Sequence, residues 1–356
     1  MTTLSIKSAE LCVNRLESAQ ELLAFRKRMA GMFLDHPLGS FPQVFNDTVN
    51  GLQDQIMRKA IAIAERSLIE EGFGPPPVPY AFVLFGSGGR REQTLWSDQD
   101  NGLIYADPAP ESALRTTDYF NKLGDRIVSS LAAAGYPPCE GGVTCNHSRW
   151  NKPAAAWSEM LQGWEEDGSW EAVRYLLIVA DLRYLYGEKE LARAVQAEFA
   201  AYTVRSPSAM SRMLENTLRR KPALGLFGHL ITERYGENAG HFDVKYGLYI
   251  PFASGIRLLA IREGVWATST SRRLELIRQK GRLSPELTLE WQRNFASALY
   301  FRKLATQEPV DGKEAPPMLD IRTLDDARKR ELKRALRSVR KLQRQVARLI
   351  ASQATN

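Results

Sequence analysis

The feature that most constrains this fold is the stretch FVLFGSGGRREQTLWSDQDNGLIY, in which two short apolar runs enclose glycines and aspartates. The first run, Phe82–Phe85, is followed by the glycine cluster Gly86–Gly89, and the second, Leu103–Tyr105, follows a pair of aspartates. Short apolar runs bounded by glycine and polar clusters are typical of buried strands. We therefore predict a strand, a glycine turn, a short helix over Arg90–Trp96 and a second strand.

The two aspartates, Asp98 and Asp100, are candidate metal ligands. Residues two apart on a strand point to the same face, so we expect these carboxylates to lie side by side. Two adjacent carboxylates repel each other unless a cation lies between them. Mg²⁺, or Mn²⁺, takes oxygen ligands and is commonly held by one or two carboxylates together with substrate phosphates. The pair therefore predicts a metal site that works on a nucleoside triphosphate.

The glycine cluster is a candidate phosphate-binding turn. Glycines allow backbone N–H groups to approach an anion closely, and a following helix would direct its positive N-terminus toward it. We assign Gly86 and Ser87 to the outer phosphates, with the Ser87 hydroxyl as a further donor. The alternatives are structural, because a glycine cluster after a strand is often only a turn and an Asp-x-Asp is often a solvated strand end.

The order of these elements resembles the signature of the nucleotidyltransferase superfamily that includes DNA polymerase beta. More narrowly, it is similar to the motif of an uncharacterised family of signal-transduction nucleotidyltransferases, whose members often carry CBS or cyclic-nucleotide-binding modules. That family resembles the uridylyltransferase of the PII protein and the adenylyltransferase of glutamine synthetase. The residues that fall on the motif are Gly86, Ser87, Gly89, Arg90, Glu92, Gln93, Asp98, Asp100 and Asn101.

This resemblance implies an enzyme that moves a nucleoside monophosphate from ATP or UTP to a hydroxyl of a regulatory protein or a small molecule and releases pyrophosphate. It adds Gly89 and Arg90 to the phosphate-binding residues. It also implies an α+β fold that is largely helical, in which a small polymerase-beta-like mixed sheet is flanked by an N-terminal helical segment and a C-terminal helical bundle. The alternatives are a nucleotide-sensing module without turnover and an RNA-modifying transferase.

Polymerase-beta-like sites need a third carboxylate, which completes the metal coordination or deprotonates the attacking hydroxyl. The candidate is Asp181 in LLIVADLRYLYGE, where the related families carry a similar acidic-x-Arg. Arg183 would then offer its guanidinium to a phosphate. The alternative is a buried helix that ends in an Asp-Arg pair, since this apolar run is compatible with either helix or strand.

We expect three domains. Residues 1–75 are rich in helix formers and predict a helical segment that forms a cap or a dimer surface, with a loop at His36–Pro42. The proline-rich Gly74–Pro79 then leads into a catalytic domain over 76–190. Residues 191–356 show helical spacing throughout and form the third domain.

The third domain also resembles the same family, in its supposed substrate-binding part. Lys245 is a candidate to neutralise triphosphate charge, and the alternative is a solvated lysine beside an Asp cap. Two departures, Ala223 in place of a proline and a loosely met Arg302–Gln307 motif, weaken the transfer of substrate identity. The matching residues are Pro222, Leu224, Gly225, Asp243, Lys245, Gly247, Pro251, Thr270, Arg273 and Leu274.

Composition excludes several classes. A hydrophobic content of 44% and a charged content of 25% are ordinary for a globular protein, and no apolar run approaches the roughly 20 residues of a spanning helix. The first residues lack the apolar core of a secretory signal, so we expect a cytoplasmic protein with no membrane partner. The three cysteines are too few for a disulfide framework. Zinc binding by Cys139, Cys145 and His147 is not expected, because no fourth ligand is near.

The basic charge is confined to one segment. Asp325–Arg348 contains ten Lys or Arg and three Asp or Glu, so it carries +7, which equals the net charge of the whole chain. Nucleic acid is therefore not expected as a partner. Apolar residues at spacings of three and four predict an amphipathic helix with a basic outer face, either solvated or in contact with RNA or an acidic protein. The apolar positions are Leu332, Leu336, Val339, Leu342, Val346 and Leu349.

Two further expectations concern the catalytic domain. Cys139–Asn146 is compatible with a short strand. Four tryptophans follow it, and we favour a helix that packs aromatic rings against the sheet over an aromatic surface that stacks bases. They are Trp150, Trp157, Trp164 and Trp170.

Overall fold

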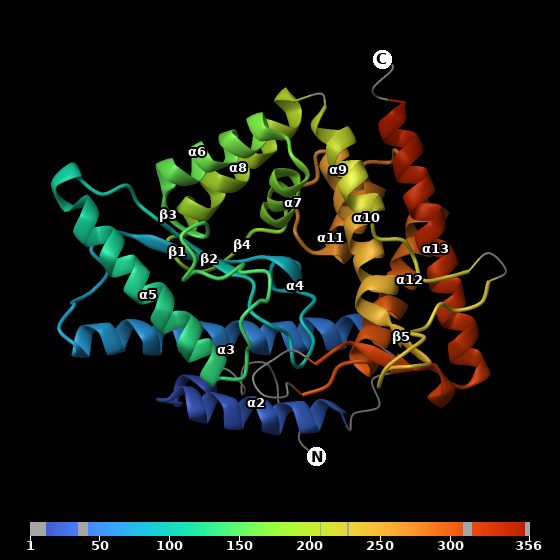
Figure 1. Ribbon diagram of the computed structural model, residues 1–356, viewed down its shortest axis with the longest axis horizontal. Helices are drawn as coiled ribbons and strands as arrows, with labels where there is room; N and C mark the ends of the chain where they lie inside the picture. Colours follow the sequence, from blue (N-terminus) through green and yellow to red (C-terminus); the bar gives the residue numbers. More distant parts are fainter. Residues whose placement is uncertain (1–11, 35–41, 207, 226–227, 309–314, 353–356) are drawn as a thin grey trace. The chain divides into compact units, whose positions relative to one another are not determined.

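The computed structural model describes residues 12–34, 42–206, 208–225, 228–308 and 315–352. The chain divides into two compact units (Figure 1). The first unit is formed by Met1–Gln162, Asp181–Glu198 and Glu308–Glu314, and the second by Gly163–Ala180, Phe199–Gln307 and Ala315–Asn356.

The first unit contains a four-stranded mixed sheet with the strand order β3-β2-β1-β4. The central strand β1 pairs antiparallel with β2 and with β4, whereas β3 runs parallel to β2. The strands are β1 (Tyr80–Leu84), β2 (Asn101–Tyr105), β3 (Asn151–Pro153) and β4 (Arg183–Gly187). The two strands that the sequence predicted are therefore adjacent, and the α+β, largely helical fold with a small mixed sheet is confirmed.

One face of this sheet packs on three helices (Figure 1). Alternate residues of a strand point to the same face, and Phe82, Leu84 and Leu103 all lie in the core that these helices form. Residues of the predicted N-terminal segment, among them Ile61, belong to the same core. The helices are α2 (Ala19–Leu34), α3 (Pro42–Glu70) and α5 (Ala113–Ala133). Of the loop predicted at 36–42, only Pro42 lies within the described residues, and it begins α3.

The opposite face carries an aromatic cluster. Phe85 lies 5.1 Å from Trp150 and 6.4 Å from Trp157, measured between ring centroids. Trp157, on α6 (Ala154–Asp167), is fully buried and donates its indole N–H to the carbonyl of Leu103 at 3.0 Å. The expectation of aromatic rings packed on the sheet is confirmed for Trp150 and Trp157, which expose no face for a base to stack on.

The short helix was predicted at the wrong residues. It is a single turn, α4 (Gly86–Gly89), and no helix forms over residues 90–96. Arg91 has a φ of 57°, which is incompatible with a continuing right-handed helix. Instead, side chains of α3 bind the carbonyls of this segment. Asn46 donates to Arg91, and Asn50 donates to Gln93.

The strand expected at Cys139–Asn146 is also absent, since these described residues form turns. Gly142 has a φ of 65°, which a strand does not allow. The segment is attached to β2 by the N–H of Asn101, which donates to Val143 at 3.0 Å. Its start is fixed by an isolated bridge between Gln99 and Pro138.

The second unit is mainly helical. Helix α10 is buried along most of its length, and a two-stranded antiparallel ribbon joins β5 to β6. The helices are α7 (Trp170–Val179), α9 (Ala209–Leu218), η3 (Lys245–Tyr249), α10 (Ile250–Arg262), α11 (Thr270–Gln279), α12 (Pro285–Leu304) and α13 (Asp326–Ala351), and the strands are β5 (His241–Asp243) and β6 (Met318–Asp320). Helix α8 (Lys189–Arg205) has residues in both units. No helix among the described residues is long and apolar enough to cross a bilayer.

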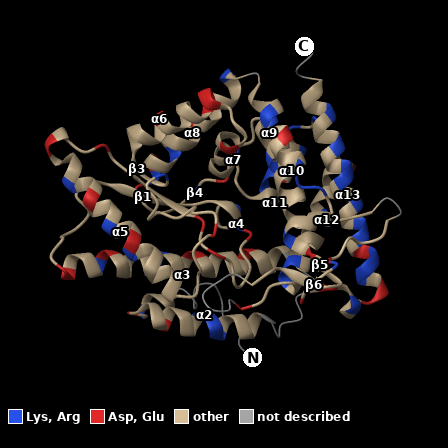
Figure 2. Cartoon of the chain, viewed as in Figure 1, with Lys and Arg blue, Asp and Glu red and all other residues tan. Residues whose placement is uncertain are grey.

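The predicted amphipathic helix is α13, and Figure 2 shows Lys and Arg along its length. Its apolar side is buried as expected, except that Ile350 takes the place assigned to Leu349, which is half-buried. The exposed cations recur at alternating intervals of four and three, so they form one stripe. They are Arg330, Arg334, Arg337, Lys341, Arg344 and Arg348.

Replacing Trp157 with Phe should lower the free energy of unfolding of the first unit by about 1–3 kcal/mol, because a fully buried side chain loses its indole hydrogen bond to the carbonyl of Leu103. Urea unfolding followed by circular dichroism measures the effect. The control is Trp170→Phe, at a side chain that is half-exposed, for which we expect a change within about 0.5 kcal/mol. Equal effects of the two substitutions would contradict a structural role for the indole N–H.

Candidate functional site

The paired aspartates lie directly before β2. Gln99, between them, is buried, and its amide donates to the carbonyls of Val128 and Tyr136 at 3.1 and 2.8 Å. Asp98 and Asp100 are half-buried, in keeping with an alternation that directs every second side chain away from the core. Ligand atoms of these two carboxylates and of the Cys139 thiol lie within 4.8 Å of one another. The structure thus brings the two predicted ligands together.

Asp100 also contacts the glycine turn. Gly86 has a φ of 50°, and a Cβ atom there would overlap Oδ2 of Asp100. The main chains are joined as well, since the N–H of Phe85 donates to the carbonyl of Asp100 at 2.9 Å. Gly86 is therefore required for two reasons, namely its backbone conformation and the carboxylate that fills the space of a side chain. This contact places the turn against the aspartate pair.

The far end of the turn is fixed by ionic contacts. Arg183 donates to the carbonyl of Gly88 from Nε at 3.0 Å and from Nη2 at 2.8 Å. The same guanidinium binds both oxygens of Asp54, on α3, at 2.7 and 3.0 Å. Arg183 was expected to contact phosphate, and in the structure these donors hold the glycine turn and α3 together.

Asp181 lies behind the same turn and is fully buried. Its Oδ2 is 2.5 Å from Nη1 of Arg90, and Nε of Arg90 is 2.9 Å from Glu92. The main-chain carbonyl of Asp181 occupies the position that a Cβ of Gly89 would take. Arg90 and Gly89, expected at the phosphates, thus contact Asp181. Asp181 itself is not one of the three grouped potential metal ligands in the described part of the chain.

Sequence reasoning did not assign Cys139 to this site. It lies about forty residues from the aspartates, and backbone contacts of Gln99 and Asn101 with residues 137–143 bring it there, so no local motif could have revealed it. Burial, together with the negative charges of Asp100 and Asp98, raises the pKa of the Cys139 thiol to about 12. A bound cation would reverse this effect, because a coordinating thiol loses its proton.

The zinc cluster is not formed. Cys145 is buried, with Sγ 3.7 Å from the carbonyl of Gly124, and Nδ1 of His147 accepts a hydrogen bond from the N–H of Arg149. Among the described residues, neither belongs to a group that could hold a metal.

Lys245 belongs to the second unit, at the start of η3. Its ammonium lies 5.9 Å from the ring centroid of Tyr246. Asp243 accepts a hydrogen bond from the N–H of Tyr246 at 2.8 Å, which is the capping arrangement that the sequence left as an alternative. Burial raises the pKa of Asp243 above its ordinary value. In the same unit, the buried Arg273 donates to the carbonyls of Ala267 and Ala180.

Two family models match the chain. Residues 37–171 match the model described as "Putative nucleotidyltransferase DUF294". Residues 207–350 match the model described as "Putative nucleotidyltransferase substrate binding domain". The first match contains the glycine turn and both aspartates, and the second contains Lys245 and most of α13. A comparison with curated proteins finds none that matches this chain.

Replacing Gly89 with Ala should lower the free energy of unfolding by at least about 2 kcal/mol, because the added methyl group meets the backbone carbonyls of Asp181 and Leu84. Urea unfolding measures the loss. The matched control is Gly51→Ala. Gly51 lies inside α3, where an added Cβ meets nothing within 4 Å, so this substitution should raise the free energy of unfolding by up to about 1 kcal/mol. The tight packing of the turn would be contradicted by a neutral Gly89 variant.

Proposed function

Since the chain belongs to the DUF294 nucleotidyltransferase family, we propose that it is a Mg²⁺-dependent enzyme that transfers a nucleoside monophosphate from a nucleoside triphosphate to an acceptor hydroxyl. The observation that carries this proposal is the position of Asp98 and Asp100. Their carboxylates can share one cation, and Asp100 contacts the glycine turn that begins at Gly86. A metal ligand and a candidate phosphate-binding turn are thereby adjacent.

The donor set fits a divalent cation. Two carboxylates within 4.8 Å of each other provide hard oxygen ligands, and neither is so deeply buried that a substrate could not reach it. Mg²⁺ or Mn²⁺, when bound there, would neutralise the charge that develops on the transferred phosphoryl group and its leaving group. The role of Asp98 and Asp100 would be to hold the cation at the edge of the glycine turn.

The turn would bind the outer phosphates through its backbone. The first backbone N–H groups of a helix have no acceptor within the helix. Those of Gly86, Ser87 and Gly88 can therefore donate hydrogen bonds to an anion. The turn is held from its other side by Arg183, which binds the carbonyl of Gly88, and by the ion pair between Arg90 and Asp181. We propose that these residues position the turn, which supports a reaction that depends mainly on orientation and charge neutralisation.

The proposed reaction is a displacement at phosphorus. The acceptor oxygen forms a bond to the α-phosphorus, the bond from that phosphorus to the bridging oxygen of the β-phosphate breaks, and pyrophosphate leaves with the electron pair. The hydroxyl proton passes to a base or to water. We propose ATP or UTP as the donor, by analogy with the related adenylyl- and uridylyltransferases, and a regulatory protein or a small molecule as the acceptor. The match to a substrate-binding domain supports an acceptor bound by residues 207–350.

Replacing Asp98 with Asn should reduce nucleotidyl transfer at least about a thousandfold, because the loss of one metal ligand removes several kcal/mol of charge stabilisation. The measurement is incubation of the full chain with each labelled triphosphate and Mg²⁺ in a cell lysate, followed by identification of the labelled acceptor. The variant should keep the thermal unfolding midpoint of the wild type within a few degrees, since Asp98 is half-buried.

The matched control is Asp118→Asn, which removes an exposed carboxylate of α5 that pairs with Lys122 and should leave transfer unchanged. Full transfer by the Asp98 variant would refute the assignment of the site. Tight binding of a triphosphate by the wild type without pyrophosphate release in any lysate would favour a nucleotide-sensing module instead.

The structure also supports Cys139 as a third donor at this metal site, because its thiol is grouped with both carboxylates. Thiolates favour softer ions than Mg²⁺. Cd²⁺ should therefore bind the wild-type chain with a thiolate-to-metal charge-transfer band in the ultraviolet. Cys139→Ser should abolish this band and weaken Cd²⁺ binding at least about tenfold. Absorbance titration measures both.

The exposed Cys12 offers the control. Cys12→Ser should retain the band and the Cd²⁺ affinity of the wild type. A band that survives in the Cys139 variant would show that the thiol is not a ligand, without affecting the aspartate assignment.

A further inference from the structure

The basic stripe of α13 lies on the exposed side of that helix (Figure 2). Its cations follow one another at alternating intervals of four and three residues, so neighbouring Cβ atoms lie about 5–6 Å apart. An α-helix rises 1.5 Å per residue, which makes the stripe about 27 Å long. Helix geometry therefore places six cations in one line. They are Arg330, Arg334, Arg337, Lys341, Arg344 and Arg348.

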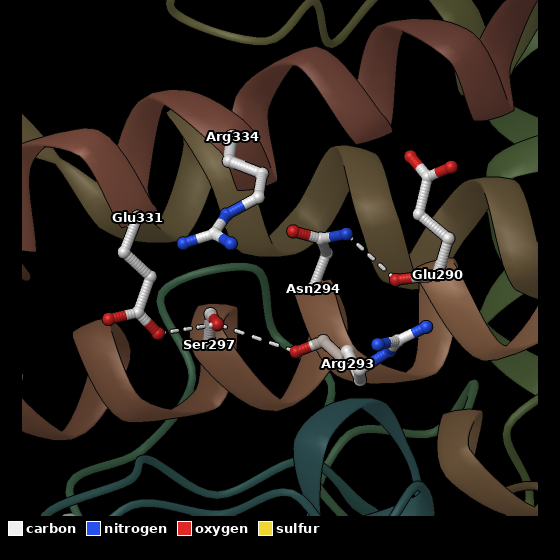
Figure 3. Close-up of a pocket in the computed structure, with 6 residues that line it drawn as sticks. All are labelled: Glu290, Arg293, Asn294, Ser297, Glu331 and Arg334. Carbon is white, nitrogen blue, oxygen red and sulfur yellow. Dashed lines mark hydrogen bonds between the residues drawn. The ribbon is translucent and has the colours of Figure 1, made fainter.

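The other side of α13 is held in the core of the second unit, where its apolar residues are buried. Near the start of the helix, Ser297 of α12 donates its hydroxyl to Oε1 of Glu331 at 2.7 Å (Figure 3). Farther along, Gln343 donates its amide to the main-chain carbonyl of Arg220 at 2.8 Å. The helix is therefore fixed at several points, and its basic side is the one that a partner can reach.

The stripe has little compensating charge. From Leu332 to Ser352 the sequence contains seven Lys or Arg and no Asp or Glu. Within the described residues, Lys341 lies 3.4 Å from Oε1 of Glu290, and none of the five arginines of the stripe has a carboxylate within ion-pair distance. Like charges three and four residues apart destabilise a helix, and a solvated helix face usually mixes both signs. A bound polyanion would remove this repulsion.

The unit around the stripe is also basic. The second unit contains 29 Lys or Arg and 16 Asp or Glu, whereas the first contains 19 and 25. The second unit therefore has a charge of +13 and the first a charge of −6, which together give the +7 of the chain. The sequence expectation against nucleic acid rested on an even balance of charge outside Asp325–Arg348. That balance conceals an acidic unit and a basic one.

The side chains of α13 indicate which polyanion fits. The helix has no aromatic residue, and among its described residues no large apolar side chain is exposed. A protein partner would need apolar side chains at the centre of the interface, and single-stranded nucleic acid would need aromatic rings on which bases stack. Helices that bind membranes insert their apolar side, which is buried here. A duplex needs only cations for its phosphates, and arginine binds phosphate oxygens in pairs.

We propose that the basic stripe of α13 binds double-stranded nucleic acid through its phosphate backbone, without reading the base sequence. One side of the helix is buried, so α13 contacts the backbone from outside and does not enter a groove. A stripe of about 27 Å matches roughly 8 base pairs. The proposal goes beyond nucleotidyl transfer, because that reaction is assigned to Asp98 and Asp100 of the first unit.

The test is fluorescence anisotropy of the full chain with labelled duplexes of about 16 base pairs, of mixed sequence, made as DNA and as RNA. A chelator is present so that no divalent ion bridges the duplex to the aspartates. If four or more cations meet phosphates, the logarithm of the affinity should fall with the logarithm of the salt concentration with a slope of about −3.5 or steeper. A single strand of the same length should bind at least about tenfold more weakly, because it carries less charge per length. The ratio of the two duplex affinities identifies the preferred duplex.

Combining Arg337→Gln with Arg344→Gln should weaken duplex binding at least about tenfold and make the salt slope less steep by about 2, since two phosphate contacts are lost. The matched control combines Arg272→Gln with Arg278→Gln. It removes the same charge from two exposed positions of α11, which packs on α10 and α12, and should change the slope by less than about 0.5. The variant of α13 should keep the thermal unfolding midpoint of the wild type, because it breaks no ion pair, and circular dichroism melts check this.

The proposal would be overturned by duplexes that do not bind, by a single strand that binds as tightly as a duplex, or by equal losses in the two double variants. Polyglutamate or phosphatidylserine vesicles that bind more tightly than the duplexes would instead assign the stripe to an acidic protein or to a membrane. Duplex binding that disappears in Asp98→Asn would place the nucleic acid at the aspartate site. Because Asp98→Asn should keep duplex binding while losing transfer, failure of this inference and failure of the proposed enzyme activity give different outcomes.

Discussion

The contact on which the candidate site depends is the one between Gly86 and Asp100. The carboxylate of Asp100 fills the space that a side chain at residue 86 would need, and Gly86 has a backbone conformation that favours glycine. This one contact sets how the end of β1 meets the start of β2. It also explains why a candidate metal ligand and a candidate phosphate-binding turn are adjacent, which neither the strand pairing nor the glycines would achieve alone.

Buried ionic contacts hold the turn from the other side. Arg90 lies between Asp181 and Glu92, and Arg183 lies between Asp54 and the carbonyl of Gly88. Buried ion pairs contribute little net stability, because desolvation offsets the attraction, but removal of one partner is strongly destabilising. Such a network fits a role in fixing the geometry of the turn. It links α3, the turn and β4, so the proposed active site draws on residues that are far apart in the sequence.

Much of the fold and part of the site followed from local pattern. The two apolar runs beside the glycines form adjacent strands. The apolar residues spaced three and four apart, such as Leu332, Leu336 and Val339, form the buried side of α13. The errors lay where tertiary contacts override local preference. Residues 90–96 were expected to be helical, but Asn46 and Asn50 bind their carbonyls. No pattern predicted Cys139 beside the aspartates, because a distant loop brings it there.

The sequence by itself determined the two strands beside the glycines, the neighbourhood of Asp98 and Asp100 and the amphipathic last helix, because periodicity and glycine conformation act over a few residues. Only the tertiary structure decided which charged groups meet. Arg183 binds Asp54 across 129 residues, and Lys341 pairs with Glu290 because α12 and α13 pack side by side. Contacts between side chains depend on how whole elements pack, and that packing is set by cores assembled from distant parts of the chain.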